Sequence, residues 1–343
     1  ELVPRSYREA AAHVLGHDAL APTLAAMTQP DLVQRVLPQR LVGLPFLPDR
    51  GRALEGGWET AWRSEMGGDD RFARGFLDVL RPRDDWVPAL FLNATAVETG
   101  NRVVTSNLDF TRDRLPDSRT PMITDTLDLL AALDGDVPFS TAVHDSARFA
   151  YVSPAGTLRR GAGPLQEASY LACAPNAPCE HVIDGGYFEN SGVVTAMDVA
   201  AAIRRVRDVP IHVLVIRYRD AGARPPEPYR WFDETLSPVW GIFNTRSARG
   251  TLAVMQLARD TDDAQVTFEL VHRPHTAEFP LGWLLSAHTR RRIDRQMGPD
   301  SAENGTAMTR VAALLGTTVR SDRFYEDAVR DGDAADAPGG GAP

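Results

Sequence analysis

Short apolar runs alternate with longer amphipathic stretches along this chain, which is the pattern of strands separated by helices. An apolar run at Val87–Asn93 predicts a buried strand, Glu180–Asp184 predicts a short strand stopped by two glycines, and Pro210–Tyr218 is the clearest strand in the chain. Arg102–Ser106 predicts another strand, joined to the first by a glycine-containing connection as in a hairpin, and Val266–Val271 predicts a late one. The pattern therefore indicates a protein of the α/β class.

A helix is expected after Glu180–Asp184, because apolar residues recur at helical spacing from Val193 to Val206. With Pro210–Tyr218 it completes a strand–helix–strand unit, which implies a mostly parallel sheet covered on both faces. Other helical patterns cover Thr124–Leu133, Ser140–Phe149, Pro238–Arg259, Leu284–Met297 and Ala307–Leu315.

The two ends of the chain and one internal stretch do not follow this pattern of strands and helices. The opening, Ser6–Leu37, is helical in pattern but is broken by prolines. Pro38–Gly57 is dense in Pro and Gly and predicts an irregular surface segment. Residues 1–330 show no internal repeat or linker and are expected to form one unit, whereas Asp331–Pro343, rich in Asp, Ala, Gly and Pro, is expected to be a disordered tail.

Composition narrows the function classes. The chain has 343 residues, of which 43% are hydrophobic and 24% charged, as in an ordinary globular protein. A net charge of -9 argues against electrostatic binding to nucleic acid. No signal peptide or membrane-spanning segment is visible. All 37 basic residues are arginine, and Arg290–Arg292 with Arg295 forms a basic face on an expected helix. A solvated surface explains that face, and contact with phosphate headgroups is the alternative.

The two cysteines, Cys173 and Cys179, are six residues apart with two prolines between them. They could close a small disulfide loop or remain free thiols, and the sequence leaves both readings open. A metal site would need further ligands at suitable spacing, and none is visible, so no metal is expected.

Ile183–Gly192 is the segment most suggestive of chemistry. It places the Asp184 carboxylate at the end of an expected strand, followed by Gly185 and Gly186, which let the backbone turn away sharply. Ligands of open α/β sheets bind at that edge. Asn190 or Ser191 could then cap the following helix, and for Ser191 capping outweighs a nucleophilic role. The alternative for Asp184 is a turn in which its carboxylate binds nearby backbone N–H groups.

This segment resembles the D-G-G motif of the patatin-like serine hydrolases. Further likenesses, in the same order as in that family, are Phe91–Thr95 with Thr99–Val104, Thr141–Phe149 with Val152–Pro154, and Tyr7–Ala10 through Asp18–Pro22. Together they cover most of residues 7–300. The resemblance implies a three-layer α/β/α patatin-like domain with a mostly parallel sheet, incomplete at its N-terminal side.

In such hydrolases an aspartate directly activates a serine held in a G-x-S-x-G nucleophile elbow. Asp184 matches that aspartate, but the chain contains no G-x-S-x-G and no glycine-rich loop beside a strand. The serine is therefore expected upstream, in a missing N-terminal segment of the same protein. A partner chain carrying the serine, or a non-catalytic relic, are the alternatives. With its first strand absent, the sheet should expose an unpaired apolar edge beside the strand ending at Asn93.

The resemblance implies a phospholipase A-like lipid acyl hydrolase with a Ser–Asp dyad, in which Asp184 is the base and Gly185, Gly186 and Asn190 support the motif. Asn93, Ser146 and Phe149 are substrate-groove candidates. The resemblance implies a lipid acyl ester as substrate, transient contact with a membrane surface and no cofactor. The implied location is cytoplasmic or membrane-associated in a bacterium. The alternative is a non-catalytic module of the same fold that binds lipid or a partner protein.

Overall fold

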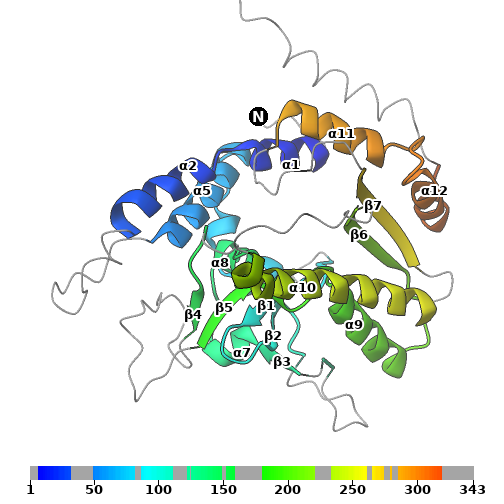
Figure 1. Ribbon diagram of the computed structural model, residues 1–343, viewed down its shortest axis with the longest axis horizontal. Coiled ribbons are helices and arrows are strands. Elements are labelled where there is room, and N and C mark those ends of the chain that lie inside the picture. The colour runs from blue at the N-terminus through cyan, green and yellow to red at the C-terminus, as the bar shows by residue number, and fades with distance from the viewer. Residues whose placement is uncertain are drawn as a thin grey trace, which may run out of the picture. The chain divides into compact units, whose positions relative to one another are not determined.

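The computed structural model describes residues 7–31, 49–81, 86–110, 122–123, 125–148, 152–158, 180–220, 233–260, 265–273, 279 and 285–318 (Figure 1). The chain divides into two compact units. Unit 1 comprises Glu1–Asp208 with Phe243–Gly250, and unit 2 comprises Val209–Ile242 with Thr251–Pro343. Phe149, both cysteines and the tail 331–343 lie outside the described residues.

The sheet of unit 1 has the strand order β3-β2-β1-β5-β4. Its strands are β1 (Phe91–Ala96), β2 (Arg102–Ser106), β3 (Thr126–Asp128), β4 (Gly156–Leu158) and β5 (Glu180–Asp184). Only β2 and β3 pair in parallel; the β1–β2, β1–β5 and β4–β5 pairs are antiparallel. The class is α/β, as predicted, but this sheet is mixed rather than mostly parallel.

The predicted strand–helix–strand unit does not form a single sheet. Strand β5 and helix α9 (Val193–Val206) are present, but the strand that follows, β6 (Val213–Asp220), pairs with β7 (Gln265–His272) and not with β5. Both neighbours of β5 are instead antiparallel strands. The parallel prediction was wrong because it inferred the pairing of β5 from the next strand along the chain.

The β1–β2 hairpin is confirmed, with Asn93 opposite Val104 and Ala94 opposite Val103. Strand β1 begins at Phe91, four residues after the start of the predicted strand at Val87, so Asn93 lies within β1 rather than at its end. On its other side β1 pairs with β5. The prediction of an unpaired edge beside β1 is therefore wrong, because β5 already pairs with β1 along that edge.

Helices contribute to the core on both faces of this sheet. One cluster joins Val103 and Val182 to Leu129, the first residue of α7 (Leu129–Leu133). Val104, which points to the opposite face, packs in another cluster together with Val199 of α9. Helix α8 (Phe139–Ser146) contacts β1 and β5. Figure 1 shows α7 and α8 beside the strands.

The helix expected at Thr124–Leu133 is in part a strand. Residues Thr126–Asp128 form β3, and α7 begins only after them. The switch occurs at Asp128, whose side chain accepts a hydrogen bond from the Ala131 backbone N–H and so caps the helix. Helical periodicity from Leu129 onward masked the three preceding extended residues.

The N-terminal part of unit 1 is helical, with α1 (Tyr7–Gly16), α2 (Leu20–Ala26) and the π-helix η1 (Met27–Asp31). The irregular segment predicted up to Gly57 is wrong from Arg50 onward, where α5 (Arg50–Glu65) begins. Asp49 caps it by accepting from the Arg52 N–H at 2.9 Å. A Cβ on Gly57 would lie in ordinary van der Waals contact with Ala19, at 3.4 Å, so α5 packs beside the start of α2 at this position. Between α5 and β1 lie η2 (Arg71–Ala73) and α6 (Phe76–Leu80).

Unit 2 is built on the parallel pair β6–β7, in register from Val213 opposite Gln265 to Asp220 opposite His272. Helices α11 (Ala287–Met297) and α12 (Gly305–Leu314) contact β7. Backbone groups of β7 bind two side-chain amides: Gln296 exchanges hydrogen bonds with Val271 at 2.7 and 2.8 Å, and Asn304 with Glu269 at 2.7 and 2.9 Å. These amides satisfy backbone groups that β6 does not pair.

The long helix α10 (Asp233–Asp260) precedes β7 and begins five residues before the predicted helix at Pro238–Arg259. The strand β7 and the helices α9, α11 and α12 lie within three residues of their predicted bounds. Among the described residues, none of the helices combines the length and the apolar character needed to cross a lipid bilayer.

Candidate functional site

Asp184 lies at the C-terminal end of β5, at the turn into the 3-10 helix η4 (Gly185–Tyr187). Its carboxylate Oδ1 accepts a hydrogen bond from the Gly186 N–H at 2.6 Å. Its carbonyl accepts from the Thr95 hydroxyl at 3.0 Å, and its own N–H donates to the Arg148 carbonyl at 3.3 Å. The residue is half-buried and firmly held, so its carboxylate has a defined position at the strand end.

Gly185 allows this turn to pass very close to β1. A Cβ at this position would lie 2.2 Å from the Asn93 carbonyl oxygen and 2.7 Å from the carbonyl carbon. Because both are backbone atoms, no rotamer change can relieve such a clash. The glycine after the aspartate is therefore required by the approach of two backbone segments, and Gly186 supplies the N–H that orients the carboxylate.

We expect Gly185→Ala to lower the free energy of unfolding by about 1–3 kcal/mol or more, since one of the two backbones must move. Gly56→Ala is the matched control: nothing lies within 4 Å of a Cβ there, and alanine favours the helix. Chemical denaturation of both variants measures the difference. Equal stability of Gly185→Ala and the parent chain would contradict the close approach.

Asn93 lies beside this turn along β1, but its side chain binds elsewhere. Its Oδ1 accepts from the Thr195 hydroxyl of α9 at 3.0 Å. The same hydroxyl accepts from Arg102 at 2.9 Å, and Arg102 also pairs with Asp198 of α9 at 2.6 Å. Asn93 thus helps to attach α9 to the sheet, and its role in a substrate groove stays a prediction.

Strand register places the candidate residues on two faces. Asp184 is opposite Ala94, and residues opposite each other in an antiparallel pair share a face. Ala94 packs with Val182 and Leu129, whereas Asn93, the next residue, shares the face of Val104 and α9. The structure therefore separates Asp184 from the Asn93 side chain, although their backbones lie close together.

Ser146 is the last residue of α8 and is half-buried. Helix α8 contacts both β1 and β5, and the carbonyl of Arg148, two residues further on, accepts from the Asp184 N–H. The end of α8 is therefore the predicted segment that the structure joins directly to Asp184. Phe149, the third groove candidate, follows this segment outside the described residues.

Neither Asn190 nor Ser191 occupies the N-cap of α9. That position is taken by Gly192, whose φ of 69° is in the left-handed region that favours glycine. Asn190 is exposed. The Ser191 hydroxyl donates to the buried Glu189 carboxylate at 2.7 Å and accepts from the N–H of Val193, the first residue of α9, at 3.4 Å. Ser191 therefore binds the start of the helix from one residue before the N-cap, which is Gly192.

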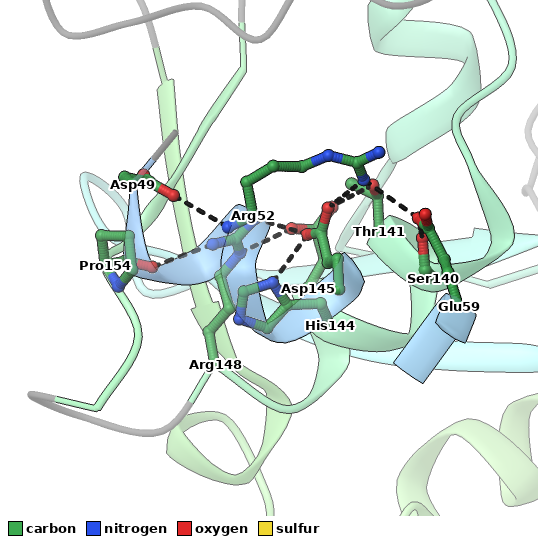
Figure 2. Close-up of polar contacts among 10 residues, drawn as sticks. Asp49, Arg52, Glu59, Ser140, Thr141, His144, Asp145, Arg148 and Pro154 are labelled. Carbon is green, nitrogen blue, oxygen red and sulfur yellow. Dashed lines mark hydrogen bonds and ion pairs between the residues drawn. The ribbon is translucent and has the colours of Figure 1, made fainter. Parts of the chain in front are cut away.

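A buried polar cluster between α5 and α8 supports the segment that leads to Asp184 (Figure 2). Glu55 of α5 is 3% exposed and His144 of α8 is fully buried. The Glu55 carboxylate lies 2.7 Å from His144 Nδ1, accepts from the Thr141 hydroxyl at 3.0 Å and pairs with Arg52 at 3.0 Å. Sequence reasoning missed this cluster, because 89 residues separate Glu55 from His144.

Arg148 links this cluster to the turn at Asp184. Its Nε donates to the Asp145 carboxylate at 2.7 Å, and its NH1 donates to the Pro154 carbonyl at 2.9 Å (Figure 2). Its NH2 lies 3.9 Å from Glu55, and its own carbonyl accepts from the Asp184 N–H. A buried guanidinium with these partners fixes the backbone that holds Asp184.

The two buried carboxylates of the cluster have pKa values shifted in opposite directions. Burial raises the pKa of Glu55, but the hydrogen bond to His144 and the charges of His144 and Arg148 outweigh burial and hold that pKa below its usual value. Burial raises the pKa of Asp145 above its usual value, and Arg148 offsets this only in part. Glu55 is therefore the member whose ionised form stabilises the fold.

Because the folded pKa of Glu55 is depressed, its contribution to stability is present above its unfolded pKa and is lost as pH falls through the folded one. We expect the free energy of unfolding of the parent chain to fall on acidification below about pH 4.3, and that of Glu55→Gln to fall less steeply. Urea titrations at several pH values measure both slopes. Parallel curves for the two proteins would contradict the assigned shift.

No family model, curated protein or solved structure matches this chain. Among the described residues, no group of three or more His, Cys, Asp or Glu side chains is arranged to hold a metal ion. The site consists of a half-buried aspartate at a strand end, whose carboxylate accepts from the Gly186 N–H and whose backbone N–H donates to the carbonyl of Arg148, a member of the buried ionic cluster.

Proposed function

We propose that this chain carries the aspartate half of a lipid acyl hydrolase that uses a Ser–Asp dyad, within a three-layer patatin-like domain. In this proposal Asp184 is the general base. It takes the proton of a serine hydroxyl as that oxygen attacks the ester carbonyl, and it then activates the water that releases the fatty acid. Because the chain contains no G-x-S-x-G, the proposal requires the serine to come from a segment encoded upstream of Glu1.

The observation that supports the proposal is the position of the Asp184 carboxylate. It ends a strand, is half-buried, and is oriented by the Gly186 N–H through one oxygen. A carboxylate held in this way can accept a proton from a hydroxyl brought within hydrogen-bond distance without first reorganising. The end of α8, which carries Ser146, adjoins it and is the part of the fold that the proposal assigns to the substrate groove.

A second candidate is a non-catalytic module of the same fold that binds lipid or a partner protein. The pairing of β1 with both β2 and β5 favours it, because the edge beside β1 is closed by the chain's own strands. The coding sequence upstream of Glu1 separates the two candidates. A G-x-S-x-G segment after an apolar strand supports the hydrolase, and its absence from the complete reading frame supports the module.

A further inference from the structure

An apolar row on β6 stands out in unit 2. Leu214, Ile216 and Tyr218 alternate along the strand and so share one face, and they are 50%, 75% and 50% exposed. Val215, which points to the other face, is 3% exposed. Three large apolar side chains in line on a strand surface are unusual for a face that only meets water.

At its Tyr218 end the apolar row contacts an aromatic ring, and that ring contacts an arginine. The ring of Tyr218 meets that of Phe279 edge to face, with the centroids 6.3 Å apart. The guanidinium of Arg292, on α11, lies 4.3 Å from the centroid of Phe279. All of these residues belong to unit 2, and the contacts of Phe279 with Tyr218 and with Arg292 link the apolar row to α11.

Helix α11 carries four arginines, Arg290, Arg291, Arg292 and Arg295, against a single acidic residue, Asp294. Arg290 and Arg295 are exposed. The chain as a whole has a net charge of -9, but charges further away than about 8 Å are screened at physiological ionic strength. A membrane close to α11 would therefore experience the local positive charge rather than the net negative one.

We propose that the β6 apolar row and the α11 arginine cluster form a docking surface for the anionic face of a lipid bilayer. Apolar side chains enter the headgroup region while adjacent arginines bind lipid phosphates, a combination that strengthens binding to anionic membranes. The charge complementarity of α11 selects this occupant over an apolar protein partner. The docking surface deepens the proposed function, on which its purpose rests, since it brings a lipid hydrolase to the bilayer containing its substrate.

The test is binding of the 343-residue chain to vesicles of ether-linked phosphatidylcholine with and without ether-linked phosphatidylglycerol, measured by co-sedimentation. Tighter binding to the phosphatidylglycerol vesicles, weakening as salt is added, is the expected result. Replacing Arg290, Arg291 and Arg295 together by Gln should reduce that affinity on the order of 100-fold. Ile216→Ser should weaken binding to both kinds of vesicle by about tenfold.

The matched control replaces Arg204, Arg205 and Arg207 by Gln, which removes the same charge from exposed positions at the end of α9. It should leave binding nearly unchanged. Loss of binding in this control but not in the α11 variant, or no binding by the parent chain, would overturn the proposal. Ether lipids contain no acyl ester, so retained vesicle binding without ester hydrolysis in a serine-containing gene product would refute the proposed function and leave the docking surface intact.

Discussion

In a gene product that includes the serine segment, Asp184→Asn should reduce acyl ester hydrolysis by a factor on the order of 10²–10⁴ while leaving the fold intact. The reason lies in how the carboxylate is held. Its Oδ1 accepts from the Gly186 N–H, and the amide oxygen of asparagine can accept the same hydrogen bond. The substitution therefore keeps the turn and removes the base.

Asp184→Ala provides the matched comparison for this prediction. It removes both the base and the acceptor for Gly186, so it should lose turnover and also about 1 kcal/mol of stability. Initial rates on a lipid ester and thermal unfolding of both variants separate the two roles. If Asp184→Asn retains full turnover while Asp184→Ala unfolds more readily, the carboxylate only forms the turn and the general-base role is wrong.

Glu55→Ala should be the most destabilising substitution in the buried cluster, costing about 3–5 kcal/mol. It leaves the fully buried His144, the Thr141 hydroxyl and the buried Arg148 without the carboxylate that they share. A cavity between α5 and α8 adds to that cost. Because Arg148 holds the backbone bound to Asp184, hydrogen exchange at the Asp184 amide should also accelerate.

Helix α5 offers its own control for this prediction. Glu65, on the same helix, pairs with His17 at 2.9 Å, but His17 is 42% exposed there. Glu65→Ala should therefore cost less than about 1 kcal/mol, as is usual for exposed pairs. Denaturant unfolding measures both variants, and similar costs for Glu55→Ala and Glu65→Ala would show that the buried cluster contributes no more than a surface pair.

The local elements of this fold were largely predictable, whereas the pairing of distant strands was not. The β1–β2 hairpin, β5 and α9 follow from apolar runs, glycine positions and helical spacing within a few residues. The antiparallel partnership of β1 with β5 joins residues about 90 positions apart, and no local pattern specifies it. Glycines in α5 misled the prediction because they lie inside a helix and not in turns: a Cβ at Gly51 would come within 3.1 Å of His144, whereas nothing lies within 4 Å of a Cβ at Gly56.

The site was predictable to a similar extent. Asp184 with its two glycines could be located, because a carboxylate followed by glycines at a strand end is a local feature. The cluster around Glu55 could not be located from the sequence. A single charged residue on an amphipathic helix is expected to face solvent until the helix that packs against it is known. His144 gave the only local signal, as a histidine among small residues on α8, and nothing in the sequence named its partner.

Labelling with a fluorophosphonate probe tests the central claim most directly, because the probe reacts only with a serine that a neighbouring base has activated. The gene product extended upstream of Glu1 should be labelled at the serine of a G-x-S-x-G segment, and Asp184→Asn should abolish most of the labelling without unfolding the protein. Absence of label from the folded, extended protein, or labelling that Asp184→Asn leaves unchanged, would contradict the assignment of Asp184 to a Ser–Asp dyad.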